Sequence, residues 1–200
     1  MVHPDQTDSR SDPRPSVAVL GDSITFESET ELRAALAEAT AVDLTALVGR
    51  PGKTFAELLA DGERIAATDP DLVVINLGTN DALKGVPVED TRLDLDALYA
   101  ALPDALIVAV AVTTRFSGSP FDVRAQAIND RLRAGCRDGA RPVAVVAWDQ
   151  IVAADDANQA DSPALDPILS DGLHPTPRGR ARLADAIAAA VADLVRTIPR

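Results

Sequence analysis

Three runs of mostly apolar residues constrain the fold of this chain more than any other feature. They cover residues 17–20, 71–77 and 105–112, and each is far too short to cross a membrane. A strand that is covered on both faces needs apolar side chains on both sides, which produces continuous runs rather than alternation. Segments with apolar residues at helical spacing follow these runs. We therefore expect a mostly parallel sheet with helices on both faces, because right-handed crossovers place them there.

Two further strands complete the predicted sheet. Residues 42–46 alternate apolar and polar side chains, which indicates an edge strand with one wetter face, and residues 142–148 form a fifth strand. An edge position for the second strand favours the order 2-1-3-4-5. The expected fold is thus a flavodoxin-like three-layer α/β/α sandwich with a five-stranded parallel sheet. Ligands bind such sheets where the strand order reverses, which here is between strands one and three.

Helix signals fit between these strands. Residues 28–31 read Ser-Glu-Thr-Glu, a capping-box pattern that predicts a helix from Ser28, and Thr54 with Glu57 predicts a second helix start. Thr176 is expected to cap the last helix, with proline at its first position. The helix from residue 121 places Cys136 on its apolar face, where a small buried hydrophobe is expected. The segment before residue 171 is predicted to be a long solvated loop, whose acidic residues lack calcium-loop spacing. These are Asp155, Asp156, Asp161 and Asp166.

Composition limits the class of protein. A formal charge of −12 over 200 residues argues against binding to nucleic acid or to an anionic membrane, since their phosphates would repel the surface. A single cysteine excludes an internal disulfide and a multi-cysteine metal site. Residues 1–15 are polar and contain prolines, so we expect a disordered tail followed by one domain over residues 16–200. The expected protein is cytoplasmic, and its oligomeric state is open.

Polar turns follow two strands that are neighbours in the predicted sheet. Gly21, Asp22 and Ser23 end the first strand, and Gly-Thr-Asn-Asp at residues 78–81 ends the third. The turn that ends at Gly52 lies on the same carboxyl edge. A sharp turn from strand to helix can lift a serine hydroxyl above the sheet, the placement that makes serine a nucleophile in other hydrolases.

His174 is the only histidine outside the expected tail, which contains His3. If the folded part uses a histidine for proton transfer, His174 must be that residue. Asp171 lies three residues earlier, a spacing that lets its carboxylate reach the ring in a turn before a helix. Such a contact would fix the tautomer of the ring and stabilise its protonated form.

Four motif blocks make the chain resemble the SGNH hydrolase superfamily, the GDSL-type esterases and lipases. They are Gly-Asp-Ser-Ile at residues 21–24, the glycine block at Gly52, residues 78–81, and Asp-Gly-Leu-His at residues 171–174. Each block alone is a weak signal. Their order along the chain, each at a strand end or a helix start, makes the resemblance specific.

The resemblance implies a role for each matching residue. Ser23 would be the nucleophile, His174 the base, and Asp171 the residue that orients His174. The oxyanion hole would consist of the backbone N–H groups of Ser23 and Gly52 and the side-chain amide of Asn80. This chemistry needs neither a metal nor a cofactor.

Each of these residues also has a purely structural interpretation. Ser23 could cap a helix, Asn80 could form an Asx turn, and Gly52 could be an ordinary turn glycine. Asp171 could hold its own loop, and His174 could be a surface residue before a proline. The catalytic hypothesis is preferred because the structural one needs a separate coincidence at every block. Asp22 and Asp81 are different, since both are expected to brace their turns rather than to react.

The predicted function is hydrolysis of a small-molecule carboxylic ester through an acyl-enzyme intermediate, with a short acyl group such as acetyl. A thioesterase or an acyltransferase would use the same residues, and a non-catalytic ligand-binding relative would keep only the fold. Five residues are candidates for the wall of the substrate pocket, two of them because their positive charge could hold an anionic or sugar-bearing part of a substrate. The charged pair is Arg50 and Lys53, and the others are Phe26, Arg115 and Phe116.

Overall fold

The computed structural model describes residues 14–39, 42–114, 116, 118–138, 141–161 and 166–198. In this part of the chain, five parallel strands form one sheet in the order β2-β1-β3-β4-β5, which confirms the predicted order and the edge position of β2. The strands are β1 (Ser16–Gly21), β2 (Asp43–Gly49), β3 (Leu72–Asn76), β4 (Leu106–Val110) and β5 (Ala144–Val146). Residues 1–13 of the predicted tail lie outside the described residues.

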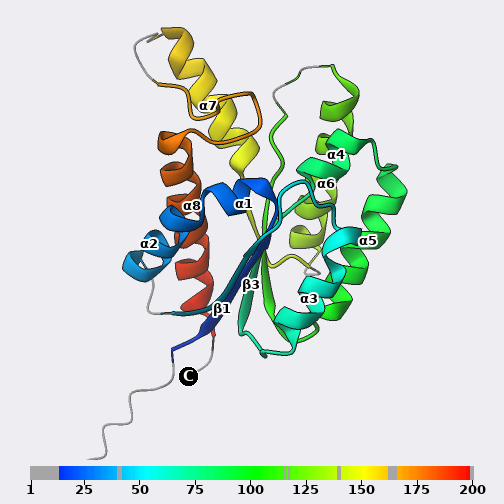
Figure 1. Ribbon diagram of the computed structural model, residues 1–200, viewed down its shortest axis with the longest axis vertical. Helices are drawn as coiled ribbons and strands as arrows, with labels where there is room; N and C mark the ends of the chain where they lie inside the picture. Colours follow the sequence, from blue (N-terminus) through cyan, green and yellow to red (C-terminus); the bar gives the residue numbers. More distant parts are fainter. Residues whose placement is uncertain are drawn as a thin grey trace, which may run out of the picture.

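Helices cover both faces of the sheet (Figure 1). On one side lie α2 (Glu29–Ala39) and α8 (Pro177–Val195), and on the other lie α3 (Leu59–Ala66), α5 (Val88–Ala101) and α6 (Pro120–Arg137). The remaining helical segments are α1 (Ser23–Glu27), η1 (Ala56–Leu58), α4 (Thr79–Lys84) and α7 (Trp148–Asp161). Within the described ranges, no helix combines the length and the apolar character needed to cross a membrane.

Strand β1, which lies between β2 and β3, shows why its apolar run is continuous. Ala18 and Leu20 belong to the hydrophobic core under α3, α5 and α6, whereas Val17 and Val19 belong to the core under α2 and α8. All four side chains are completely buried. An alternating strand in the centre of this sheet would have to bury polar groups against one helical layer.

A short helix that was not predicted precedes the helix indicated by the capping pattern at Ser28. Helix α1 begins at Ser23, where the Asp22 side chain accepts a hydrogen bond from the backbone N–H of Ile24. Helix α2 follows at Glu29, and the hydroxyl of Ser28 is buried without a hydrogen-bond partner among the described residues. The helix predicted from Ser28 is therefore present as α2, but the Ser28 hydroxyl does not cap it.

The predicted acidic loop after β5 is largely helix α7, so that prediction is also wrong. Asp155 in this helix is buried and forms an ion pair with Arg178 of α8, with 2.7 Å between Oδ1 and Nη2. Asp149 is buried as well and pairs with Arg133 of α6 at 2.7 Å. The acids of α7 thus anchor the helix between α6 and α8. Near the C-terminal end of α6, Cys136 is only partly buried, and its thiol donates to the carbonyl of Val143.

Candidate active site

Ser23 lies at the carboxyl edge of the sheet because β1 ends at Gly21 and α1 begins immediately. Gly21 permits this close turn, since a Cβ there would lie 1.9 Å from the Thr25 hydroxyl. The Oγ atom of Ser23 lies 3.0 Å from Nε2 of His174, although the two residues are 151 positions apart in the sequence. The fold therefore brings the predicted nucleophile and base into direct hydrogen-bond contact.

Asp171 organises both the loop and the ring of His174. Its Oδ1 accepts the backbone N–H groups of Leu173 at 2.9 Å and His174 at 2.8 Å, and its Oδ2 lies 2.8 Å from Nδ1 of the ring. With the proton on Nδ1 donated to this carboxylate, the lone pair on Nε2 faces the Ser23 hydroxyl. The Asp171 side chain therefore both braces its own loop and contacts the His174 ring, and its catalytic role stays a prediction.

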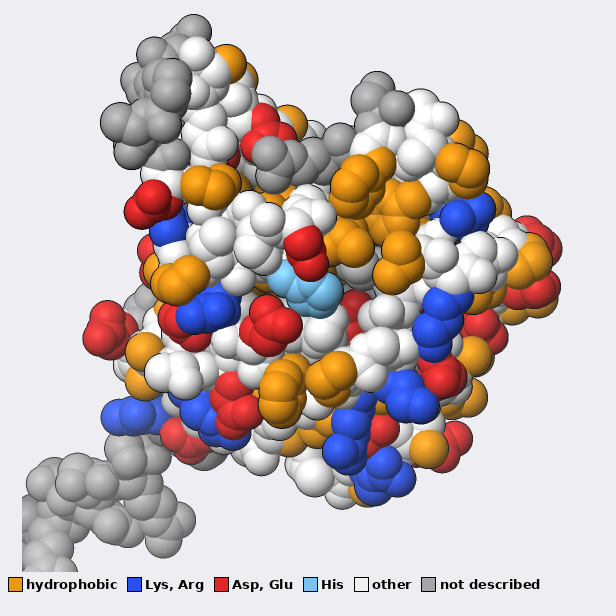
Figure 2. Space-filling model, turned by 45° about the horizontal axis from the view of Figure 1, so that its top comes forward, with side chains coloured by type: hydrophobic (Ala, Val, Ile, Leu, Met, Phe, Trp, Pro, Cys, Tyr) orange, Lys and Arg blue, Asp and Glu red, His pale blue; other side chains and the backbone are white. Residues whose placement is uncertain are grey.

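The same contacts determine the electrostatics of the pair. Partial burial alone would raise the pKa of Asp171, but the hydrogen bonds from His174 and Leu173 lower it to about 2. The hydrogen bond with Asp171 raises the pKa of His174 above its ordinary value, against the effect of partial burial. The imidazole of His174, the one histidine within the described residues, lies at the surface of the molecule with acidic side chains beside it (Figure 2).

Helix α8 anchors the loop that holds His174. Thr176 caps this helix as predicted, with its hydroxyl accepting the N–H of Gly179 at 3.2 Å and with proline at the first helical position. The backbone N–H of Ser170 donates to the carbonyl of His174 at 2.9 Å, and that of Thr176 donates to Ile168 at 3.0 Å. These bonds fix the loop at both sides of the ring.

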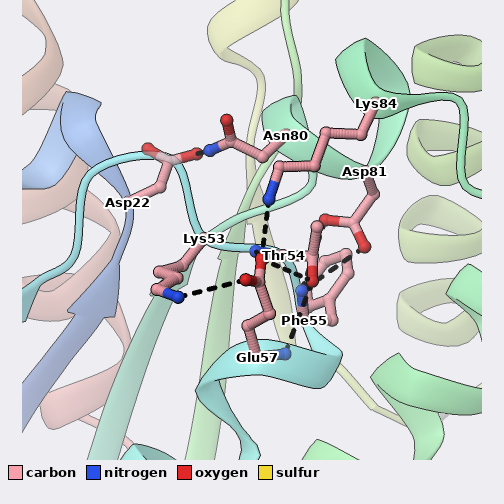
Figure 3. A network of polar contacts seen from close by, with 8 residues as sticks. All are labelled: Asp22, Lys53, Thr54, Phe55, Glu57, Asn80, Asp81 and Lys84. Atoms are coloured by element: carbon pink, nitrogen blue, oxygen red, sulfur yellow. Dashed lines mark hydrogen bonds and ion pairs between the residues drawn. The ribbon is translucent and has the colours of Figure 1, made fainter.

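Asn80 reaches the site from the neighbouring strand. Gly21 and Asn76 are paired at the ends of β1 and β3, so the turns that follow lie side by side. Asn80 is in the first turn of α4, buried, and its Nδ2 donates to Oδ2 of Asp22 at 3.0 Å (Figure 3). Gly78 makes this turn possible with a φ of 110°, in the left-handed region that favours glycine.

The Gly52 turn lies against the end of β1. The backbone N–H of Arg50 donates to the carbonyl of Gly21 at 2.9 Å, and that of Lys53 donates to Arg50 at 3.3 Å. Gly52 itself has a φ of 75°, and a Cβ added to it would find no heavy atom within 4 Å. The turn therefore places open backbone next to Gly21, two residues before Ser23.

Polar side chains hold the chain beyond this turn (Figure 3). The N–H of Phe55 lies 3.3 Å from both carboxylate oxygens of Asp81. Thr54 and Glu57 form the predicted capping box, in which Glu57 accepts the N–H of Thr54 at 3.1 Å and the Thr54 hydroxyl accepts the N–H of Glu57 at 3.4 Å. Lys84 of α4 contacts the same Glu57 carboxylate at 2.7 Å.

A family model decides which class of protein this arrangement belongs to. The model of the GDSL-like lipase/acylhydrolase family matches residues 19–182. The chain belongs to this family. It is therefore a GDSL-type hydrolase, as the resemblance of its motif blocks predicted. A search of curated protein sequences gives no match.

Solved structures share the fold of this GDSL-type hydrolase at low sequence identity. A member of the lipolytic G-D-S-L family from Veillonella parvula has a TM-score of 0.69 and 19% identity, covering 88% of this chain and 97% of that chain. A family 3 carbohydrate esterase from Clostridium thermocellum has a TM-score of 0.67 and 17% identity, covering 92% and 98%. The catalytic domain of a peptidoglycan O-acetyltransferase from Streptococcus pneumoniae has a TM-score of 0.65 and 16% identity, covering 94% and 97%.

The predicted pocket residues of the GDSL-type hydrolase occupy different surroundings. Phe26 is 55% exposed and lies one helical turn after Ser23 on α1. Phe116 packs against the loop that holds His174, because a Cβ on Gly172 would lie 2.6 Å from its ring. Arg50 and Lys53 are paired with the acidic side chains of Asp61 at 3.4 Å and Glu57 at 3.1 Å. Arg115 lies outside the described residues.

Two carboxylates, that of Asp22, which contacts Asn80, and that of Asp81, the next residue in the chain, are buried. Burial raises the pKa of Asp22 to about 6, although the N–H of Ile24 and the charge of His174 act in the opposite direction. Burial likewise raises the pKa of Asp81 to about 6, against the N–H of Phe55. Neither side chain exposes any surface. Sequence patterns indicated that both brace their turns, but the contact between Asp22 and Asn80 joins residues 58 positions apart and has no local signal.

No three His, Cys, Asp or Glu side chains within the described ranges are grouped so that they could hold a metal ion. The polar groups that meet at the carboxyl edge are instead a hydroxyl, an imidazole, a carboxylate and an amide. That set can transfer a proton and stabilise an anion, which is the requirement of acyl transfer.

Proposed function

We propose that this GDSL-type hydrolase is a serine esterase that cleaves a short-chain carboxylic ester through an acyl-enzyme intermediate. The observation that carries the proposal is the hydrogen-bond chain from Asp171 through His174 to Ser23, with distances of 2.8 and 3.0 Å. A nucleophile, a base and an orienting acid in this order are the parts that covalent acyl transfer requires.

In the first half of the reaction, the Ser23 Oγ attacks the ester carbonyl carbon while its proton moves to Nε2 of His174. The carbonyl oxygen becomes an oxyanion, which the backbone N–H groups of Ser23 and Gly52 and the amide of Asn80 stabilise. The tetrahedral intermediate then collapses, the bond to the alcohol oxygen breaks, and the alcohol leaves with the proton from Nε2.

The second half repeats these steps with water. His174 takes a proton from water as the oxygen attacks the acyl carbon, and Nε2 returns that proton to Ser23 when the ester bond to the enzyme breaks. The carboxylic acid is released. Asp171 keeps the imidazole in one tautomer throughout and stabilises its protonated form.

A short acyl group is proposed because the site lies open at the surface and the chain as a whole has few aromatic side chains. His174 keeps a third of its side chain exposed, and the chain is only 3% aromatic. The likeness to structures described as a carbohydrate esterase and an O-acetyltransferase supports a small acyl group, and the latter keeps acyl transfer open as a second function.

The test combines active-site labelling with a substrate panel. We expect a fluorophosphonate probe to label the wild-type protein and not the Ser23→Ala variant. We expect turnover to be fastest with p-nitrophenyl acetate or a sugar acetate, and to decline along a series of longer p-nitrophenyl esters. Absence of labelling in folded wild-type protein would reject the serine esterase in favour of a ligand-binding protein. Faster turnover of an acyl-CoA, or acyl transfer to an added sugar that exceeds hydrolysis, would assign the alternative functions.

A further inference from the structure

Asp22 has no part in the proton transfers just described, yet it is fully buried beside Ser23. Each of its carboxylate oxygens accepts a different N–H group. Oδ1 accepts the backbone N–H of Ile24 at 3.0 Å, and Oδ2 accepts the side-chain N–H of Asn80 at 3.0 Å. The first bond caps α1, while the second bond crosses to α4.

The second bond determines which way round the Asn80 amide lies. An ionised carboxylate can only accept hydrogen bonds, so the nitrogen of the amide, not its oxygen, must face Asp22. An amide nitrogen carries two N–H groups. One is used by Asp22, and the other remains for the oxygen of a bound ester. If the amide rotated by half a turn, its oxygen would take that place and would repel an oxyanion.

We propose that Asp22 is a positioning residue that holds the amide of Asn80 in the orientation required to donate to the oxyanion. This inference rests on the proposed function, because it assigns Asp22 to the oxyanion hole of that reaction. It also gives a reason for a carboxylate in a buried place, where burial opposes its ionisation.

The isosteric change Asp22→Asn tests this role because Asp22 receives two donors. The amide oxygen of an asparagine can accept only one of the two N–H groups, while its NH₂ group faces the other. If the oxygen of the new asparagine keeps the bond from Ile24, its NH₂ group faces Asn80. The Asn80 amide must then turn its oxygen toward this NH₂ group. The volume of the side chain is unchanged.

Asp81 provides a matched control. It is also fully buried and loses the same charge in Asp81→Asn, but its carboxylate accepts only its own backbone N–H and that of Phe55, which lies 3.3 Å from both oxygens. An amide oxygen can accept this N–H without turning any group of the site. A general effect of removing a buried charge would appear in both variants, whereas a positioning effect would appear only in Asp22→Asn.

The kinetic experiment is a double-mutant cycle with p-nitrophenyl acetate. We expect Asp22→Asn and Asn80→Ala each to lower kcat by about 100- to 1,000-fold, with KM changed by less than about threefold. The double variant is expected to be no slower than Asn80→Ala, because Asp22 acts through Asn80. Asp81→Asn is expected to keep kcat within about fivefold. The proposal would be rejected if the double variant showed the product of the two single reductions in kcat, or if Asp22→Asn had the kcat of the wild type.

A second measurement does not depend on activity. In ¹⁵N-labelled protein, the side-chain NH₂ signals of Asn80 are assigned by their loss in Asn80→Ala. We expect them to shift as Asp22 takes up a proton near pH 6, and we expect the shift to persist in His174→Gln and Asp81→Asn but to vanish in Asp22→Asn. Signals that do not titrate would overturn the proposal even if the protein is an esterase. If the signals titrate but no fluorophosphonate labels the protein, the proposed function is rejected, while the contact between Asp22 and Asn80 stands.

Discussion

Asp81→Asn should change how the stability of the protein depends on pH. Burial raises the pKa of Asp81 from 3.8 to about 6 in the folded protein. The folded state therefore binds a proton at pH values where the unfolded chain has already released it. For an acid shifted in this direction, the free energy of unfolding decreases as the pH rises from about 4 to 6 and stays lower above that range.

The magnitude follows from the size of the pKa shift. A rise of about two units corresponds to about 3 kcal/mol, since each unit represents about 1.4 kcal/mol. Asparagine does not titrate, so the variant lacks this penalty. The charges that act on Asp81 are those of Asp94 on α5 and Lys84 on α4, with Asp22 adjacent, and all of them remain in the variant.

The assay is urea unfolding of wild type and Asp81→Asn at several pH values between 4 and 8. We expect the difference in unfolding free energy to move by about 3 kcal/mol in favour of the variant over this range. That difference corresponds to about 6 to 12 °C in Tm for a chain of this size. Comparing the two proteins at each pH removes any constant effect of the new NH₂ group. A difference that is independent of pH, or that moves toward the wild type, would refute the reasoning.

The remaining predictions concern the loop that holds His174. Gly172→Ala should destabilise the protein and lower kcat, because its φ is 88° and a Cβ would lie 2.6 Å from the ring of Phe116. Gly118→Ala, with a φ of 76° and no atom near the new Cβ, is the strain control, and Phe116→Ala should partly rescue Gly172→Ala if the ring contact matters. The acid limb of kcat/KM should lie above the ordinary pKa of histidine, about 6.5, because Asp171 raises the pKa of His174. Asp171→Asn should move that limb to lower pH and reduce kcat, and an unmoved limb would exclude His174 as the titrating base.

Much of the fold could be predicted because its strands are either buried on both faces or clearly at an edge. The continuous run in β1 and the alternation in β2 arise directly from these two environments. Helix α7 could not be predicted, because its environment produces no such clear pattern. Its buried face combines Trp148 and Val152 with the acids Asp149 and Asp155, so it has no regular apolar stripe. Those acids are stabilised by arginines of α6 and α8, which no local pattern can reveal.

In the candidate site, too, contacts between residues close in sequence could be predicted, whereas contacts between distant segments could not. His174 and Asp171 could be found because they are close in sequence and their spacing is informative. The hydrogen bond between Asp22 and Asn80 and the contact of Phe116 with Gly172 could not, since each joins two loops that meet only in the folded protein. The start of α1 at Ser23 was also missed, because a helix of five residues is too short to show periodicity.

The negative charge of Asp22 would oppose catalysis if the oxyanion formed alone. In the proposed reaction the oxyanion forms together with protonated His174, because the proton of Ser23 moves to Nε2 as the new bond forms. The pKa of His174 is raised first by its bond with Asp171, and the charges of Glu27 and Asp22 add to this effect. Asp22 therefore attracts the positive charge that develops on His174 and repels the oxyanion. Its net electrostatic effect is small, so its effect on kcat comes from its bond to Asn80. Hence Asp22→Asn should lower kcat. An increase in kcat would show that repulsion of the oxyanion outweighs the orientation of the amide.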